Sequence, residues 1–180
     1  MSNIMLDLET LGTGNNAVII SIGAVLFDMN DVYSNAFYTR VNPQSCVDVG
    51  MKITVSTVLW WMKRSDIARA EFDKQNVPIK EALQNFSNWM DVATNYDKFE
   101  DRKVWGNGAT FDNVIIDNAF KACKLEKPWP YWGDACYRTL KNLFPDVKME
   151  RSGTFHHALD DARSQAEHCI RLMKAAGVWK

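Results

Sequence analysis

The sequence predicts an α/β fold: a mixed sheet, with three antiparallel strands followed by parallel strands, flanked by helices. Two observations predict it. Three apolar runs rich in β-branched residues lie within residues 3–41 and are joined by short turns, which favours an antiparallel meander. Strand and helix patterns follow along the rest of the chain, and such units place helices on the faces of a sheet.

The three opening strands are bounded by turn residues, and they are expected over residues 3–9, 17–27 and 32–41. Because side chains alternate along a strand, Leu6 and Leu8 are expected to point into a core. Asp7 and Glu9 then share the opposite face.

A fourth strand is expected over residues 103–106. Helices are expected over residues 55–62, 66–72, 78–93, 134–144 and 158–175. One more helix follows the fourth strand, with Thr110 as its expected N-cap. The residues expected on its inward stripe are Phe111, Val114, Ile115, Ala119 and Ala122.

The length favours one domain spanning residues 1–180. Net charge is −1, so no basic field over the whole chain points to nucleic acid, although a local patch and bound metal suffice to hold a phosphate. The four cysteines are widely spaced and fit reduced thiols in a cytoplasmic protein. No apolar run is long enough to span a bilayer, so no membrane partner is expected.

Acidic residues recur at the ends and starts of the expected elements. Two carboxylates on one strand face, such as Asp7 and Glu9, repel each other unless a cation lies between them, and a hard ion such as Mg²⁺ takes oxygen ligands. Asp112 and Asp161 begin later helices, where the helix dipole favours an acid with or without a site. Asp161 closes the sequence His-His-Ala-Leu-Asp-Asp, which the dipole alone does not explain.

Three motifs resemble those of the DnaQ-like DEDDh 3′–5′ exonucleases, which have the RNase H-like fold. They are Asp7-Leu8-Glu9-Thr10, Asn107-Gly108-Ala109-Thr110-Phe111-Asp112 and His156-His157-Ala158-Leu159-Asp160-Asp161-Ala162. They occur in the family's order, and the matched stretch covers nearly the whole chain. Three further stretches resemble a bacterial and phage branch of this family, which includes RNase AS-like exoribonucleases and phage exodeoxyribonucleases. They are Ser21-Ile22-Gly23-Ala24, Trp60-Trp61 and Trp105-Gly106-Asn107-Gly108.

The resemblance implies a metal-dependent 3′–5′ exonuclease that hydrolyses single-stranded RNA or DNA from a free 3′-hydroxyl to nucleoside 5′-monophosphates. Asp7, Glu9, Asp112 and Asp161 would bind two Mg²⁺ ions, for which Mn²⁺ can substitute, in a two-metal mechanism. His156 would be the general base. RNA is favoured over DNA on the branch resemblance alone, since the residues themselves do not distinguish the sugars.

Two adjacent histidines compete for the role of general base. The histidine subclass of the family places this residue five positions before the last acid, which selects His156, whereas the tyrosine subclass spacing of four would select His157. A residue in the loop before a helix also has more freedom of direction than one nearer the first turn. His157 is therefore expected to face solvent or a substrate phosphate.

The same resemblance implies substrate contacts at Leu8, Thr10, Leu11, Trp61 and Phe111. The backbone around Leu8 and Thr10 would face the terminal sugar, and Leu11 would wedge against the terminal base. Trp60 and Trp61 are adjacent, so on a helix only one is expected to be fully buried, and the other is free to stack on a base.

Two other functions are compatible with this fold. A non-catalytic nucleic-acid-binding module would be expected to lose one or more acids, and here all four acids and the histidine are present. A metal-dependent endonuclease would not require a free 3′ end, so a circular substrate separates it from an exonuclease. Family members often form dimers, which makes a homodimer a further expectation.

Overall fold

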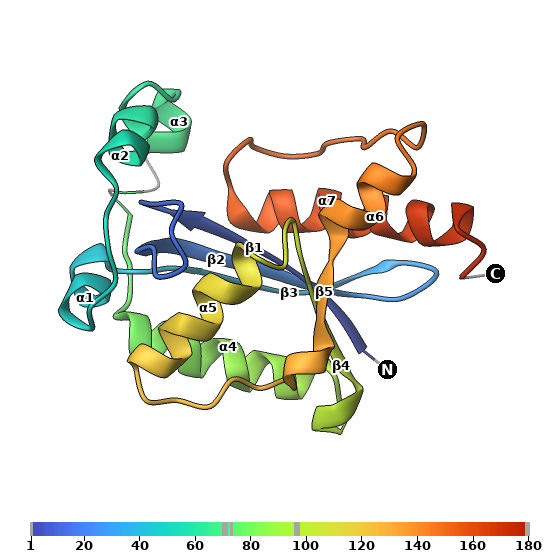
Figure 1. The fold of residues 1–180 in the computed structure, drawn as a ribbon, viewed down its shortest axis with the longest axis horizontal. Helices are drawn as coiled ribbons and strands as arrows, with labels where there is room; N and C mark the ends of the chain where they lie inside the picture. The colour runs from blue at the N-terminus through green and yellow to red at the C-terminus, as the bar shows by residue number, and fades with distance from the viewer. Residues whose placement is uncertain (1, 70–71, 73, 96–97, 179–180) are drawn as a thin grey trace.

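The computed structural model describes residues 2–69, 72, 74–95 and 98–178. Within these residues, five strands form one mixed sheet: β1 (Ser2–Thr10), β2 (Ile19–Phe27), β3 (Val32–Arg40), β4 (Arg102–Gly106) and β5 (Asp134–Cys136). Their order in the sheet is β3-β2-β1-β4-β5 (Figure 1). β1 pairs with β2 in antiparallel orientation and with β4 in parallel orientation, so the predicted combination is confirmed.

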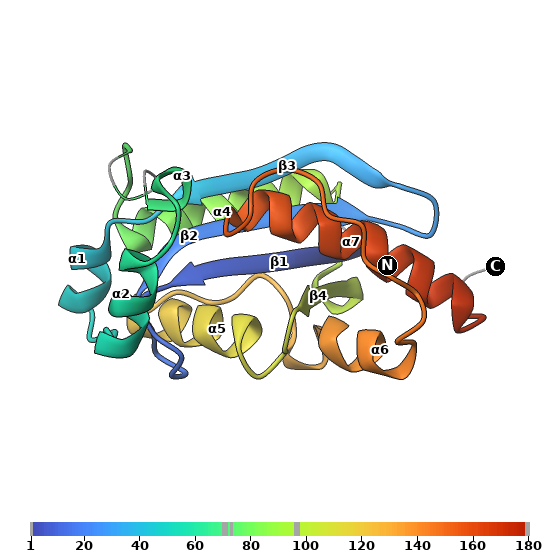
Figure 2. The ribbon, with the colours of Figure 1, turned by 90° about the horizontal axis from the view of Figure 1, so that it is seen from above.

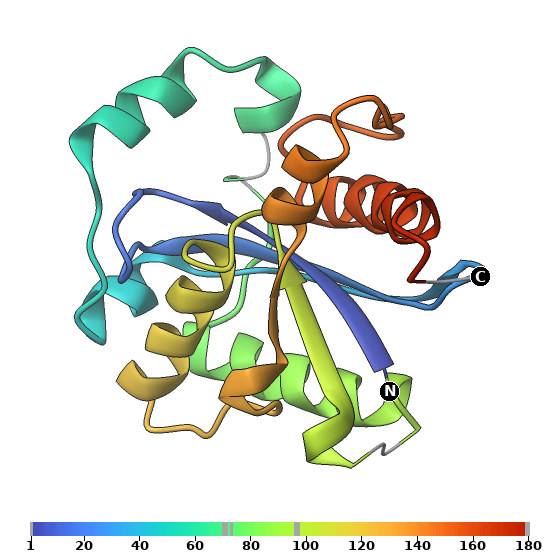
Figure 3. The same cartoon turned by 45° about the vertical axis from the view of Figure 1, so that its right-hand side comes forward.

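Helices cover both faces of the sheet. They are α1 (Pro43–Asp48), α2 (Val55–Met62), α3 (Asp66–Arg69), α4 (Ile79–Ala93), α5 (Asp112–Ala122), α6 (Tyr137–Leu143) and α7 (Ala158–Ala175), with short 3₁₀ turns η2 (Phe99–Asp101) and η3 (Tyr131–Gly133). α7 lies on one face and α4 and α5 lie on the other (Figure 3). α2 stands beyond the carboxyl end of β1 (Figure 2). Within the described part of the chain, no helix has the length and apolar character needed to cross a membrane.

Two apolar cores flank the sheet, because β1 alternates its side chains between the faces. Leu6 and Leu8 are buried in the core on the α4 and α5 side, as predicted. Met5 is buried in the second core, which α7 covers. Asp7 and Glu9 lie near the carboxyl end of β1, and Asp7 accepts a hydrogen bond from α7, which places it on that face as the alternation predicts.

α7 approaches the sheet closely because its inward stripe is made of small residues. Ala158, Ala162 and Ala166 recur every four residues, and all three are fully buried. The helix packs on β1, β2 and β3, and Figure 2 shows it running along these strands. Its first turn, which carries Asp161, therefore comes to rest near the carboxyl end of β1.

The region predicted as a helix over residues 134–144 begins differently. Its first three residues form β5, which pairs in parallel with β4, and the helix α6 begins only at Tyr137. Asp134 is fixed at this edge by hydrogen bonds that its Oδ1 accepts from Trp129 Nε1 at 2.8 Å and Asn113 Nδ2 at 2.9 Å. A strand of three residues is too short to show alternation, so the sequence pattern missed it.

The start of α5 also differs from its prediction. The Phe111 N–H donates to the Gly108 carbonyl in a tight turn, so the helix begins at Asp112 and Thr110 is not its N-cap. The buried face is rotated accordingly: Ala122 is exposed, and Val114 is only half-buried. The buried residues of the helix are Asp112, Asn113, Ile115, Ile116, Ala119 and Phe120.

Three smaller differences concern element ends. β2 begins at Ile19 rather than at residue 17. α1 follows β3 where no helix was predicted, and the Asn42 side chain caps it by accepting hydrogen bonds from the N–H groups of Gln44 and Ser45. In the region 66–72, α3 ends at Arg69, and residues 70–71 lie outside the described residues.

Candidate active site

Four acidic side chains meet at the carboxyl end of β1. Asp7 and Glu9 come from the strand, Asp112 from the first turn of α5, and Asp161 from the first turn of α7. All four line one cavity of about 220 Å³ together with His156. We call this space the acid cavity. The structure thus brings together all five residues that were predicted from the sequence to take part in catalysis and metal binding.

Asp7 carries the most crowded of these carboxylates. Its pKa is raised well above the ordinary value, first by burial and then by the negative charges of Asp112, Glu9 and Asp161. Gln165 of α7 opposes this shift by donating a hydrogen bond from Nε2 to Asp7 Oδ1 at 2.7 Å. A carboxylate in such surroundings needs a compensating positive charge to stay ionised at neutral pH.

Glu9 and Asp112 are perturbed in the same direction. Burial, followed by the charges of Asp161 and Asp112, raises the pKa of Glu9 to about 8. Burial also raises the pKa of Asp112 to about 7, although the Leu8 N–H favours the ionised form by donating to Asp112 Oδ1 at 3.3 Å. This hydrogen bond also ties the start of α5 to β1, between the two acids of the strand.

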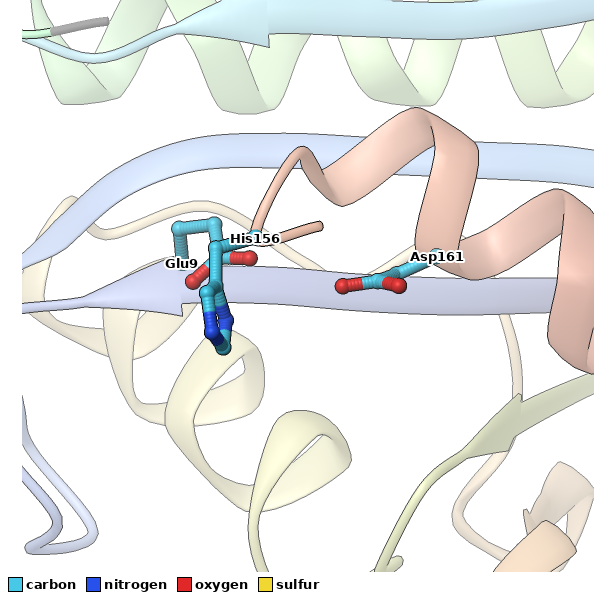
Figure 4. Close-up of side chains that lie close together, drawn as sticks. All are labelled: Glu9, His156 and Asp161. Atoms are coloured by element: carbon cyan, nitrogen blue, oxygen red, sulfur yellow. The ribbon is translucent and has the colours of Figure 1, made fainter. Parts of the chain in front are cut away.

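Glu9, His156 and Asp161 converge from separate parts of the chain, and one ligand atom of each lies within 4.8 Å of the others (Figure 4). Together with Asp7 and Asp112 they form a half-buried set of mutually repelling carboxylates beside an imidazole. Oxygen donors of this kind suit a hard divalent cation, which would remove the repulsion. The residues present therefore fit Mg²⁺ or Mn²⁺.

His156 occupies the acid cavity in a strained conformation. Its φ is +61°, in the left-handed region that costs a residue with a side chain about 1–2 kcal/mol. Such strain is concentrated at functional sites. The ring lies edge-on to Trp60, with centroids 4.9 Å apart. Burial lowers the pKa of His156, Asp161 opposes this and Arg64 reinforces it, so the neutral, proton-accepting form is favoured at neutral pH.

His157 lies outside the acid cavity. It is the N-cap residue of α7, and its carbonyl accepts a hydrogen bond from the Asp161 N–H at 3.0 Å. Its ring stacks on Tyr38 of β3 with centroids 4.4 Å apart, and its side chain is only 19% exposed. The expectation that His157 faces solvent is therefore wrong, because its ring packs on Tyr38 and its Nδ1 lies 3.4 Å from Asp160 Oδ2. A contact of His157 with a substrate phosphate stays a prediction.

A second cavity of about 390 Å³ adjoins the acid cavity and shares Leu8, Glu9 and Phe111 with it. We call it the aromatic cavity. The rest of its lining comes from the turn after β1 and from α2, and includes Thr10, Thr13, Thr57, Trp60 and Trp61. Its mostly apolar and aromatic walls suit an apolar or aromatic group placed beside the acids.

The two tryptophans of α2 differ in burial, as predicted. Trp61 is 5% exposed and donates from Nε1 to the Thr10 carbonyl at 2.9 Å, so it fixes α2 against the end of β1. Trp60 is 38% exposed and presents the more accessible ring to the aromatic cavity.

Leu11 is separated from the other nominated substrate residues. It is buried and lines a different apolar cavity, behind Trp61 and beside Val58 and Phe72. The nominated residues that do line the aromatic cavity are Leu8, Thr10, Trp61 and Phe111.

Four residues that line the acid cavity were not predicted as site residues from the sequence: Asn107, Arg138, Arg151 and Gln165. Gln165 follows Asp161 by four residues, so helical spacing places both on one face, and this signal was available. Arg138 comes from α6 and Arg151 from the loop between α6 and α7. No local pattern indicates that either side chain lines the acid cavity.

Known sequences resemble this chain over most of its length. A family model described as the 3′–5′ exoribonuclease Rv2179c-like domain matches residues 2–173. The exodeoxyribonuclease of Enterobacteria phage T4 is 25% identical over 162 aligned residues, which cover 77% of this chain and 70% of that protein.

Solved structures share the fold at low sequence identity. The nuclease domain of 3′hExo, a DEDDh family member bound to rAMP, has a TM-score of 0.67 and 14% identity over 99% of this chain and 94% of that one. Pop2p of S. pombe, in a form with bound Mg²⁺ and Mn²⁺, has a TM-score of 0.63 and 12% identity, covering 99% and 85%. Exonuclease X in complex with 5′ overhanging duplex DNA has a TM-score of 0.59 and 16% identity, covering 97% and 93%.

The family match, the RNase H-like architecture and the four acids with His156 in one cavity agree with one another. The chain belongs to the Rv2179c-like family of 3′–5′ exoribonuclease domains and is a 3′–5′ exonuclease of the DEDDh type.

Proposed function

We propose that the chain removes nucleotides one at a time from the 3′ end of single-stranded RNA, by a two-metal mechanism, and releases nucleoside 5′-monophosphates. The main support is that four carboxylates and one imidazole line the acid cavity together. The aromatic cavity, of about 390 Å³, adjoins it and shares Leu8, Glu9 and Phe111 with it.

Asp7, Glu9, Asp112 and Asp161 would hold two Mg²⁺ ions, for which Mn²⁺ would substitute. When bound, the ions would supply charge neutralisation at the phosphodiester and make water easier to deprotonate. The raised pKa values of Asp7 and Glu9 support this assignment, because they reflect negative charge that the cluster does not balance by itself.

His156 is assigned the proton transfer. Its lowered pKa leaves a ring nitrogen able to accept the proton of the attacking water at neutral pH. Asp161 lies close enough to stabilise the imidazolium that results. Gln165 supports the same chemistry from α7 by holding the Asp7 carboxylate in one orientation.

The aromatic cavity is assigned to the terminal nucleotide. Trp60 offers a stacking surface there, and stacking on an aromatic ring tolerates any base. Leu8 and Phe111 line both cavities, so a sugar between them would place its phosphate beside the acids. A pocket for one nucleotide favours removal of an end over cleavage within a strand.

RNA is proposed over DNA because the matched family is described as an exoribonuclease domain. The phage T4 relative, in contrast, is named an exodeoxyribonuclease. Among the structural neighbours, one is bound to rAMP and another to duplex DNA. Both sugars therefore belong in the test.

The test uses labelled RNA and DNA of equal sequence with Mg²⁺, each carrying a 3′-hydroxyl or a 3′-phosphate, and a covalently closed single-stranded circle. Linear RNA with a 3′-hydroxyl should be degraded fastest, and mononucleotides should appear from the first time point. The 3′-phosphate and the circle should resist. Cutting of the circle would support an endonuclease, and binding without hydrolysis would support a non-catalytic module.

The same proposal includes the domain organisation, the cellular compartment and the oligomeric state of the protein. Residues 1–180 would act as one exonuclease domain. The four cysteines are free thiols, which supports a reducing compartment such as the cytoplasm. A homodimer is the remaining part of the proposal, and analytical ultracentrifugation tests it.

A further inference from the structure

Arg151 pairs with one of the acids proposed to hold a cation. Its Nη1 donates to Asp161 Oδ1 at 2.5 Å, and the side chains of Arg151 and Asp161 are 37% and 13% exposed. Hydrogen bonds between two charged partners are among the stronger polar contacts in proteins. A guanidinium and a divalent cation would therefore compete for the same carboxylate.

The main chain that carries Arg151 is anchored to α7. The Thr154 N–H donates to Asp160 Oδ2 at 2.8 Å. Gly153 has a φ of +81° and lies so close to Asp160 that an added Cβ would be 2.4 Å from the Asp160 Cγ. The loop is therefore held in place relative to the first turn of α7. To free Asp161 from its ion pair, only the side chain of Arg151 has to move.

The second contact of Arg151 permits such a movement. The guanidinium lies 4.6 Å from the centre of the Phe155 ring, which is 61% exposed. A cation–π contact at an exposed ring is weak compared with a charged hydrogen bond. Phe155 can thus hold the guanidinium loosely beside the acid cavity without locking it onto Asp161.

Arg138, which lines the same cavity, is held differently. Its Nη2 donates to the Asn107 carbonyl at 2.5 Å, and its guanidinium covers Gly108, where an added Cβ would be 3.3 Å from the Arg138 Cζ. Arg138 thus hydrogen-bonds main chain, and it acts on the acids only through its charge, which opposes the rise that burial causes in the pKa of Asp112. A cation that enters the acid cavity has no reason to displace it, which makes Arg138 a matched comparison for Arg151.

We propose that Arg151 is an exchanging phosphate-binding residue: it neutralises Asp161 while divalent cations are absent, and it turns to a backbone phosphate of the nucleic acid when a cation takes Asp161. A planar guanidinium matches phosphate oxygens in a two-pronged geometry, so the released side chain has a partner of the right chemistry. This inference rests on the proposed function, because it requires a cation at Asp161.

Binding of Mn²⁺ to the whole chain without nucleotide, followed by electron paramagnetic resonance, tests the exchange. Arg151→Gln should bind Mn²⁺ about tenfold more tightly than wild type, because Asp161 loses its competing partner. Two controls also remove one positive charge each: Arg138→Gln from the acid cavity and Lys148→Gln from the loop that carries Arg151. Each should change the affinity for Mn²⁺ by less than about threefold.

Two further measurements separate exchange from a general charge effect. In an Asp161→Asn background, the gain in Mn²⁺ affinity from Arg151→Gln should disappear, whereas a through-space effect on the other acids would persist. With saturating Mn²⁺, Arg151→Gln should weaken the binding of adenosine 5′-monophosphate about tenfold in calorimetry. Without Mn²⁺ it should have no such effect, because the guanidinium is then engaged by Asp161.

The outcomes distinguish the two proposals. Equal Mn²⁺ affinities of wild type and Arg151→Gln, or a gain that persists with Asp161→Asn, would overturn the exchange and leave the proposed function intact. A loss of nucleotide binding that is the same with and without Mn²⁺ would do the same. If no folded variant binds Mn²⁺ at all, with folding checked by circular dichroism, both proposals fail.

Discussion

Gly23 of β2 and Ala158 of α7 are in backbone contact: a Cβ added to Gly23 would lie 2.2 Å from the Ala158 carbonyl carbon. Gly23 is also the cross-strand partner of Asp7 on β1. Asp161 lies one turn further along the helix that begins at Ala158. The absence of a side chain at one position of β2 thus sets how closely Asp161 approaches Asp7.

Gly23→Ala should therefore damage both stability and catalysis. The added methyl group has to push the first turn of α7 off the sheet, and overpacking of this kind typically costs about 1–3 kcal/mol. We expect a lower midpoint in urea unfolding and a reduced kcat in the folded protein. Gly14→Ala is the control, because its nearest neighbouring atom would be 3.8 Å away. Wild-type kcat in Gly23→Ala would show that this contact does not position Asp161.

Asp7→Asn should abolish activity and stabilise the metal-free protein. Activity should fall by orders of magnitude because a metal-binding carboxylate is lost. In EDTA at pH 8, the free energy of unfolding should be higher than for wild type, since burial and the neighbouring carboxylates raise the pKa of Asp7 and one of several repelling charges is gone. Asp117→Asn is the control, because Asp117 lies at the surface of α5 in an ion pair with Lys121. A destabilised Asp7→Asn protein in EDTA would contradict this account.

The stability of the metal-free protein should fall as pH rises from about 4 to about 8. The pKa of Glu9 is raised to about 8 and that of Asp112 to about 7, whereas both groups titrate near 4 in an unfolded chain. Between these values the native state binds more protons than the unfolded state, so the free energy of unfolding decreases with pH. Thermal unfolding in EDTA across this range measures the effect. Saturating Mg²⁺ should reverse the trend, because it favours the ionised carboxylates.

His156→Ala should lower kcat about 10²–10⁴-fold, the usual cost of losing a general base, with metal binding retained. His157→Ala should affect stability more than kcat, because its ring packs on Tyr38 outside the acid cavity. His156→Gly should be as inactive as His156→Ala yet more stable by about 1 kcal/mol, since glycine accepts the φ of +61° without strain. The reverse order of kcat values for the two alanine variants would move the base to His157.

Replacing the two tryptophans of α2 should separate binding from stability. Trp60→Ala should raise KM for RNA about five- to one-hundredfold, which corresponds to the loss of one base–aromatic stack, with little effect on unfolding. Trp61→Ala should cost about 3–5 kcal/mol of stability, because it empties a buried site and leaves the Thr10 carbonyl without its donor. Urea unfolding and steady-state kinetics on both variants provide the comparison.

The sequence could predict the parts of the site that depend on local periodicity. Alternation along β1 predicted that Leu6 and Leu8 point into a core and that the two acids share the opposite face, which α7 covers in the structure, because one buried face suffices to determine orientation in a strand. The choice of His156 over His157 came instead from the spacing in the histidine subclass that the chain resembles, and the structure places His156 in the acid cavity.

Other parts depend on tertiary contacts that no local pattern encodes. Arg151 contacts Asp161 only because the loop between α6 and α7, which has no periodic pattern, is held against α7. Arg138 of α6 contacts the carbonyl of Asn107, which lies far away in the sequence. His157 was misplaced because the neighbour that holds it, Tyr38, lies far away in the sequence. β5 is too short to carry a period, and its existence depends on pairing with β4.

The site draws its acids from the first strand and the last helix of the chain, and this has a consequence for the order of synthesis. A growing polypeptide that has emerged from the ribosome as far as residue 157 carries Asp7, Glu9 and Asp112, but Asp161 and Gln165 come only with α7. Until that helix folds onto β1 and β2, the site is incomplete. The proposed hydrolysis of RNA therefore cannot begin before α7 has been synthesised and has folded onto the sheet.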